Sequence, residues 1–261
     1  MIRWAPRVVA AVAAVAGAVA VALAAAPAIA RADDDRGDDV HDPWRPGLLP
    51  PGAVQLGLGG WARRADRAVG VMPELWLGVG RRLTLGLSHA PGSDGLAAPP
   101  RGACVHACPT RYRGALIAHV DLGAGDRVLG QAALVIDAVA PTAVAIELGV
   151  VARWRQGRTW ARVEPALRLG VYGRALANRE RAGVGLAVGV DLTAAVTLGA
   201  AVTPRGPADE HFFAGLVLPT RVELAARLPA AFTVGVAAGT DDSLAVGGGH
   251  ALAALLVSWR R

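Results

Sequence analysis

The chain has 261 residues, of which 53% are hydrophobic, 5% are aromatic and 33 are glycine. Its formal net charge is +6 at pH 7, from 27 basic and 21 acidic residues, and every basic residue is an arginine. A positive excess this small gives no reason to expect binding to nucleic acid.

Residues 1–32 have the organisation of a secretory signal peptide. Arg3 and Arg7 precede an apolar stretch over 8–26, and two overlapping small-x-small cleavage sites follow within 28–32. Because the apolar stretch is long, an uncleaved anchor helix is the alternative. The pattern predicts that the rest of the chain is exported.

Residues 33–52 form an acidic and proline-rich segment with six aspartates and four prolines. High charge and high proline content are typical of a solvated, unpaired chain, so we expect a periplasmic tether here. The aspartates between 33 and 39 could supply carboxylate oxygens to calcium, but they lack the loop glycine and spacing of known calcium loops. We therefore expect no metal and no cofactor.

Residues 142–172 alternate strictly between two faces on both sides of a short turn at Gln156-Gly157. One face is apolar, as at Val144, Ile146 and Leu148, and the other carries charges of both signs. Period-two alternation of this kind predicts a long antiparallel hairpin. Its strands exceed the usual length of about five or six residues and match the roughly nine to eleven that a strand needs to cross a bilayer.

Similar alternation recurs from residue 53 onward. It predicts an all-β fold over 53–261, a closed antiparallel transmembrane β-barrel of about twelve strands. The expected strands span 53–62, 74–79, 83–89, 114–122, 128–138, 142–155, 158–172, 183–192, 195–203, 212–228, 231–238 and 247–259. The most apolar stretch, 183–202, alternates and contains Asp191, which favours strands over a membrane helix. Connections after the even-numbered strands are short, and most of the others are longer and more polar.

These features together resemble a Gram-negative outer-membrane β-barrel protein of the porin-like class. The resemblance rests on the signal peptide, the alternating strands, the short and long connections, and a final strand that reaches the aromatic residue Trp259. It is one of architecture, covers about residues 53–259, and does not select one family. It implies the outer membrane of a Gram-negative bacterium, with membrane lipid and the barrel-assembly machinery as partners. The chain departs from the class after Trp259, where Arg260 and Arg261 follow.

An arginine on the lipid face near the bilayer centre costs roughly 2–4 kcal/mol, so the charges on these strands are expected to point into the lumen. By parity, the candidate lumen-lining residues are Asp121, Glu147, Arg153, Arg162, Glu164, Arg168, Arg221, Glu223 and Arg227. The predicted turn at Gln156-Gly157 pairs Glu147 with Ala166 and leaves Glu147 diagonal to Glu164 and Arg168. We expect a ladder of mixed charge along this hairpin.

Two functions fit such a lumen. In the first, which is the one we favour, the protein is a porin-like passive channel for small solutes. Its arginines would favour anions, since a ring of one sign selects the other. In the second, acids and arginines neutralise each other and close a structural or surface-interaction barrel. Barrel size does not decide, because about eight strands can be filled by side chains and about sixteen leave a wide channel.

An outer-membrane enzyme is a third hypothesis, which the serines do not support. Nucleophilic catalysis needs a serine and a histidine within reach on a common face. Ser88 and His89 are neighbours that point to opposite faces, and His250 and Ser258 lie about 27 Å apart along one strand. We therefore expect that the protein is not an enzyme.

The two cysteines, Cys104 and Cys108, lie in the longest predicted outer loop. In an exported chain, two cysteines this close in sequence most simply form one local disulfide. A metal site from Cys104, His106 and Cys108 lacks a clear fourth ligand and needs reduced thiols. We therefore expect the disulfide.

Overall fold

The computed structural model describes residues 47–63, 68–88, 103–106, 114–124, 127–139, 142–173, 178–240 and 251–261. These residues form a closed antiparallel β-barrel of 12 strands, which confirms the predicted fold class. Its strands are β1 (Val54–Arg63), β2 (Ala68–Gly80), β3 (Leu83–Ser88), β5 (Gly114–Asp121), β6 (Val128–Val139), β7 (Thr142–Gln156), β8 (Thr159–Tyr172), β9 (Arg181–Asp191), β10 (Val196–Val202), β12 (Thr220–Leu228), β13 (Phe232–Thr240) and β14 (Ala251–Arg260). Two short strands, β4 (Ala103–His106) and β11 (Arg205–Pro207), pair with β2 and β9. Within the described ranges, no helix is long and apolar enough to span a membrane.

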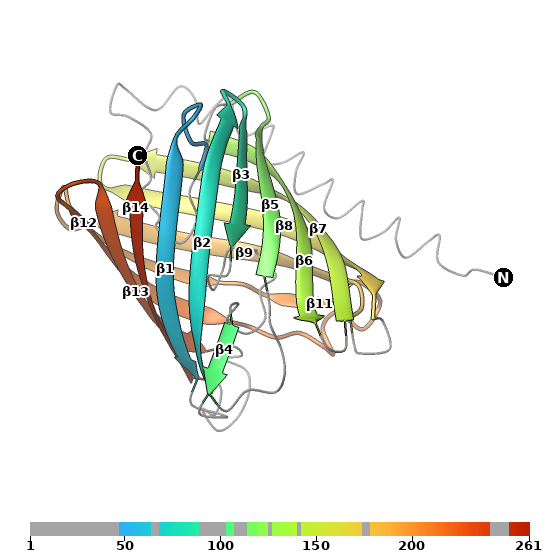
Figure 1. Cartoon of the computed structure of the whole chain (residues 1–261). Helices are drawn as coiled ribbons and strands as arrows, with labels where there is room; N and C mark the ends of the chain where they lie inside the picture. Colours follow the sequence, from blue (N-terminus) through green and yellow to red (C-terminus); the bar gives the residue numbers. More distant parts are fainter. Residues whose placement is uncertain are drawn as a thin grey trace.

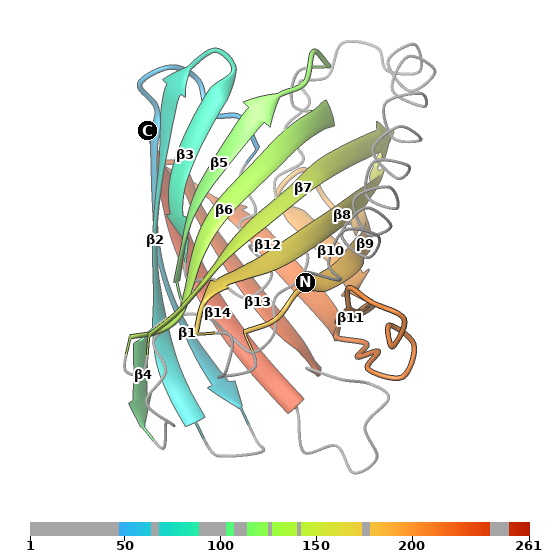
Figure 2. The ribbon, with the colours of Figure 1, turned by 90° about the vertical axis from the view of Figure 1, so that its right-hand side faces the viewer.

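The barrel closes where its first strand meets its last. Each strand pairs with its neighbour in the chain, and β1 pairs with both β2 and β14 (Figures 1 and 2). At the end of this seam, Val54 and Arg261 exchange two backbone hydrogen bonds of 2.8 Å. Closure pairs both edges of every strand in the described ring, which removes the main route to edge-to-edge aggregation.

The two ends of the barrel differ. One end, called here the turn end, holds the start of β1, the end of β14 and the turns that follow β2, β5, β7, β9 and β12. The other end, called the loop end, holds the remaining connections. All five connections at the turn end are short, as expected, and the loop end has the long connections β3–β5 and β10–β12. The loop end also has the short connections β1–β2 and β6–β7, so the alternation is imperfect.

The central hairpin, β7 and β8, has strands of 15 and 14 residues. Its turn is Gly157-Arg158 and not Gln156-Gly157, because Gln156 pairs with Thr159. Of the two turn residues only Gly157 has a positive φ, of 58°, which fits a type II′ turn with glycine first. The predicted register was therefore wrong by two residues, and Glu147 lies opposite Arg168 instead of Ala166. The faces are unchanged, since a shift of two preserves parity.

Two prolines interrupt the predicted strands differently. Opposite Pro165 the β7–β8 ladder is broken at Val150 and Val151 and then resumes in the same register, because proline has no N–H to donate. The predicted strand 212–228 was wrong in its first half, since β12 begins only at Thr220. Pro219 immediately precedes β12, and a turn closed by the hydrogen bond from Gly215 N to His211 O occupies part of the preceding segment.

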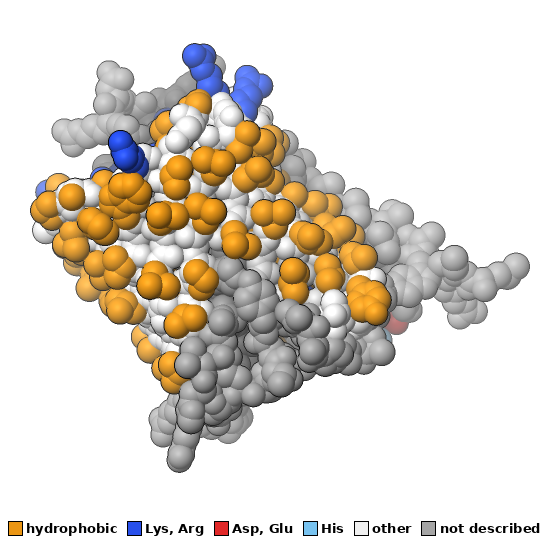
Figure 3. All heavy atoms as spheres, in the orientation of Figure 1, with side chains coloured by type: hydrophobic (Ala, Val, Ile, Leu, Met, Phe, Trp, Pro, Cys, Tyr) orange, Lys and Arg blue, Asp and Glu red, His pale blue; other side chains and the backbone are white. Residues whose placement is uncertain are grey.

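The outer wall is a broad apolar surface. Every second residue of most strands is an exposed aliphatic, and Figure 3 shows such side chains spread over the face of β1, β2, β3, β5 and β6. They include Leu56, Leu58, Leu75, Leu77, Leu85, Leu87, Leu116, Leu134, Ile146, Leu148, Leu186, Val188, Val222, Leu224, Leu255 and Val257. An exception is the middle of the central hairpin, where Val150, Ala152 and Leu167 share the outward parity but are buried. An apolar band of this extent is typical of a lipid-facing wall.

Three tryptophans fill the inner wall by lying over glycines. A Cβ atom on each of these glycines would overlap the indole ring, and each glycine is the direct cross-strand partner of its tryptophan. The pairs are Trp61 over Gly70, Trp76 over Gly86, and Trp160 over Gly189. A large ring over a strand glycine stabilises the sheet where the glycine alone would weaken it.

Candidate functional site: the charged lumen

The densest group of inward-facing charges lies on the central hairpin. Glu147 and Arg153 come from β7, and Arg162, Glu164 and Arg168 come from β8. Strand parity turns all of them away from the apolar outer wall. Their exposed fractions range only from 1% to 6%. These side chains are therefore enclosed and do not line a wide water-filled space.

Glu147 and Arg168 are direct partners across the β7–β8 ladder and form a buried ion pair. Arg168 Nη1 donates to Glu147 Oε1 at 3.1 Å, and Arg168 Nη2 donates to Asn178 Oδ1 at 3.1 Å. The Asn178 amide in turn donates to the backbone carbonyls of Val144 at 2.7 Å and Tyr172 at 2.6 Å. One carboxylate, one guanidinium and one amide thus form a continuous buried network near the loop end.

Asn178 reaches this position because β8 leaves room for it. A Cβ at Gly170 would overlap the Asn178 backbone carbonyl, so glycine is required where the segment before β9 folds against the inner wall. Asn178 was not among the residues predicted to face the lumen. It lies in the connection between the predicted strands 158–172 and 183–192, and a single asparagine in a connection carries no signal that it returns into the barrel.

Arg162 is held by two neighbours on its own strand. Its Nε lies 2.7 Å from Glu164 Oε1, and its guanidinium carbon lies 5.9 Å from the Trp160 ring centroid. Residues two apart on a strand share a face, so the sequence alone places this trio together. Arg153 lies directly opposite Arg162, an arrangement of like charges that costs stability unless a carboxylate is close. Glu164 supplies that carboxylate.

The predicted residues outside the central hairpin divide into two kinds. Arg221 and Glu223 form an ion pair on β12 and are largely buried. Arg227 has the same parity but is exposed near the turn end. Asp121 accepts hydrogen bonds from the amides of Gly123 at 2.8 Å and Ala124 at 3.1 Å, and therefore shapes the turn after β5. Its carboxylate also lies 3.9 Å from Arg82 Nε.

Further inward-facing polar residues join this set. Arg155 of β7 pairs with Asp191 of β9, which also accepts a hydrogen bond of 2.6 Å from Thr197 Oγ1. Glu74 is buried and shares the parity of Trp76 on β2, but it was not among the predicted lumen-lining residues. It is the first residue of the predicted strand 74–79, so its parity alone would have placed it inward.

The arrangement neutralises charge locally. Four inward arginines of the described chain each contact a carboxylate, in the pairs Arg155–Asp191, Arg162–Glu164, Arg168–Glu147 and Arg221–Glu223. Selectivity for ions of one sign needs a ring of the opposite sign, and paired charges do not provide one. Four of the described inward arginines are thus neutralised by a carboxylate.

No group of three His, Cys, Asp or Glu side chains is placed to hold a metal ion among the described residues. The predicted Cys104–Cys108 disulfide lies outside the described side chains and stays a prediction.

The fold is similar to that of two porins of known structure. The NanC porin superposes with a TM-score of 0.55 at 9% identity, over 78% of this chain and 97% of that one. The KdgM porin superposes with a TM-score of 0.50 at 6% identity, over 78% and 98%. No protein-family model matches the chain, and no curated protein matches its sequence. At these identities the likeness is one of fold, and the chain has the fold of an outer-membrane β-barrel.

Proposed function

We propose that the chain is an integral outer-membrane β-barrel protein of a Gram-negative bacterium. We propose further that ion pairs inside the barrel close its lumen. The protein then acts as a structural or surface-interaction barrel and does not serve as an open porin. The apolar outer wall and the fold shared with two porins support membrane insertion. Soluble monomers rarely expose one continuous apolar surface of this extent.

One observation carries the choice of a closed lumen, namely the burial of Glu147 and Arg168 as a hydrogen-bonded pair. Only 1% of Glu147 is exposed, although it faces the inside of the barrel near mid-strand. Removing a charge from water costs several kcal/mol unless an opposite charge and hydrogen bonds compensate. Both are present here. A hydrated pore would leave these groups in contact with water.

A porin-like channel for small solutes, with anions favoured, is the second candidate. Two observations favour it: both superposed structures are porins, and Arg153 and Arg162 are adjacent in the ladder. The carboxylates beside these arginines oppose strong anion selectivity.

Liposome swelling separates the two functions. The purified full chain is refolded into liposomes, which are then placed in iso-osmotic solutions of small sugars and of sodium salts. The closed barrel predicts swelling rates equal to those of empty liposomes. Rapid swelling with small sugars would favour the channel, and faster swelling with anionic than with neutral solutes of equal size would identify anion preference. Heat-modifiable gel mobility is the control for folding.

A further inference from the structure

The chain turns back into the barrel immediately before β1. Ala53 N donates to Pro50 O at 2.9 Å, and Gly52 has a φ of 78°. Proline at the second position and glycine with positive φ at the third are what a type II turn requires, and Pro51-Gly52 supplies both. The turn reverses the chain at the turn end of the barrel, so the preceding residues run along the inner wall.

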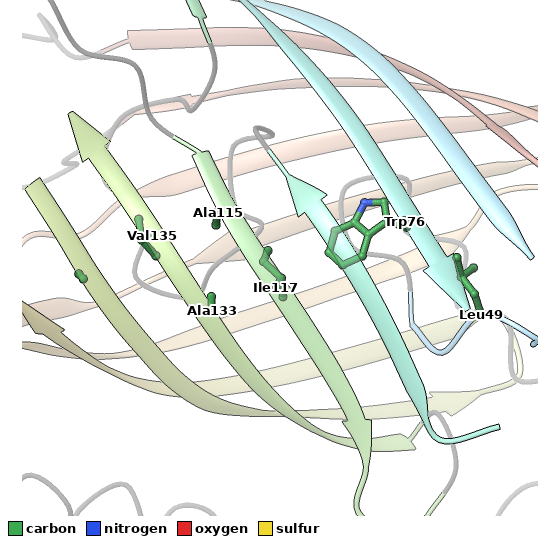
Figure 4. Packing of buried hydrophobic residues seen from close by; sticks show 7 residues of the cluster. Leu49, Trp76, Ala115, Ile117, Ala133 and Val135 are labelled. Carbon is green, nitrogen blue, oxygen red and sulfur yellow. The ribbon is translucent and has the colours of Figure 1, made fainter. Parts of the chain in front are cut away.

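Leu49 is the residue that this turn delivers into the lumen. Only 2% of it is exposed, and its amide donates to Thr84 Oγ1 of β3 at 2.7 Å. Its side chain belongs to an apolar cluster with inward residues of β2 and β5, among them Trp76 and Ile117 (Figure 4). The burial of Leu49 among apolar side chains and the hydrogen bond of its amide hold this short segment in one defined position.

The barrel wall has a glycine where the segment crosses it. A Cβ at Gly78 would overlap the Pro50 carbonyl, so only glycine allows this contact. Gly78 also accepts a hydrogen bond of 2.8 Å from Gly52 N and donates one of 2.9 Å to Ala53 O. Gly80 lies two residues further along β2, and a Cβ added there would meet no other atom within 4 Å. A methyl group at Gly80 would therefore not reach the segment.

We infer that residues 47–52 are a stopper that closes the turn end of the lumen and can leave its seat without unfolding the barrel. Thr84, which holds the stopper, pairs with His119, which pairs with Gln131, so these three buried residues form one layer across β3, β5 and β6. Because the Leu49 amide bonds to the first residue of this layer, the stopper should cover the layer. Its few hydrogen bonds lie outside the barrel ladder, and segments held in this way open more easily than the sheet. The inference rests on the proposed membrane barrel but not on the ion pairs of the central hairpin.

Cysteine accessibility tests whether the stopper is held in this position. In the full chain with Cys104 and Cys108 replaced by serine, Leu49→Cys reports on the stopper through its rate of reaction with a polar maleimide. We expect Gly78→Ala to raise this rate about tenfold, because the added methyl displaces Pro50, and Gly80→Ala to leave it within about twofold. Equal rates in all three proteins would overturn the inference.

A second reporter tests closure. Gln131→Cys lies in the layer behind the stopper, and its modification should also accelerate about tenfold in the Gly78→Ala protein. Leu49→Asp, which leaves the barrel wall untouched, should have the same effect and covers the case in which Gly78→Ala does not fold. Unchanged modification of Gln131→Cys in a folded Leu49→Asp protein would show that the segment closes nothing. Liposome swelling by the wild type would instead contradict the proposed closed lumen and leave both cysteine results interpretable.

Discussion

Glu147 and Arg168 face each other across the β7–β8 ladder, and their side chains meet at 3.1 Å inside the barrel. The two residues combine direct cross-strand pairing with opposite charge. Because both side chains are buried, each charge depends on the other to offset its loss of hydration.

Removing one partner of this pair should destabilise the barrel strongly. Arg168→Met leaves the Glu147 carboxylate buried without the arginine that faces it, at an expected cost of about 3–5 kcal/mol. The double variant Glu147→Leu with Arg168→Met should lose much less, since no charge is left behind. Urea unfolding followed by gel mobility measures both. The exposed Arg227→Met is the control, expected to stay within about 0.5 kcal/mol of the wild type. A single variant as stable as the double would contradict this dependence.

The tryptophan–glycine pairs predict a second stability effect. Gly189→Ala should destabilise the barrel by about 1–3 kcal/mol, because its methyl group needs the space that the Trp160 ring occupies. Gly60→Ala is the matched strand control, since the nearest atom to an added methyl there is 3.6 Å away. Equal unfolding midpoints for the two variants would mean that Trp160 does not lie over β9.

The β12–β13 turn contains backbone strain that glycine would relieve. Ala230 and Ala231 have φ of 59° and 63°, in the left-handed region that costs an L-residue roughly 1–2 kcal/mol. Ala231→Gly should therefore raise the unfolding midpoint. Ala194→Gly, in the β9–β10 turn where the structure shows no such φ, should lower it by making the unfolded chain more flexible. The opposite ranking of the two variants would refute this conformation.

The apolar outer wall predicts that the cost of introducing an arginine depends on its depth in the bilayer. Leu148→Arg, in the middle of β7, should cost about 2–4 kcal/mol in a lipid bilayer, whereas Leu228→Arg at the turn end should cost about 0–1 kcal/mol. Both leucines are exposed in the structure, so the difference would come from the surrounding lipid. Refolding yields in liposomes measure it. Equal yields would indicate that β7 does not lie across a bilayer.

The sequence predicted which face of a strand each residue occupies better than it predicted the cross-strand partner of that residue. Parity along a strand follows directly from the alternation, which is why Glu147, Arg162 and Glu164 were assigned inward from the pattern alone. Register depends on turn geometry, and placing Gly157 second instead of first in its turn moved the predicted partner of Glu147 from Arg168 to Ala166.

The local sequence pattern could not predict where a loop or terminal segment folds back into the barrel. Pro51-Gly52 is recognisable as a turn signal, but nothing local shows that the turn sends Leu49 into the lumen. Asn178 is the equivalent case near the loop end. The apolar run over 212–219 resembled the start of a strand, and only the proline before Thr220 suggested that the ladder begins later.

The current through the purified full chain in a planar bilayer tests the closed lumen most directly. We predict that the wild type is silent, and that Glu147→Gln with Glu164→Gln conducts anions when Leu49→Asp also releases the stopper, because the arginines of the central hairpin then lose their carboxylates and draw in water. Steady conductance by the folded wild type, unchanged by these substitutions, would contradict a lumen closed by its own ion pairs.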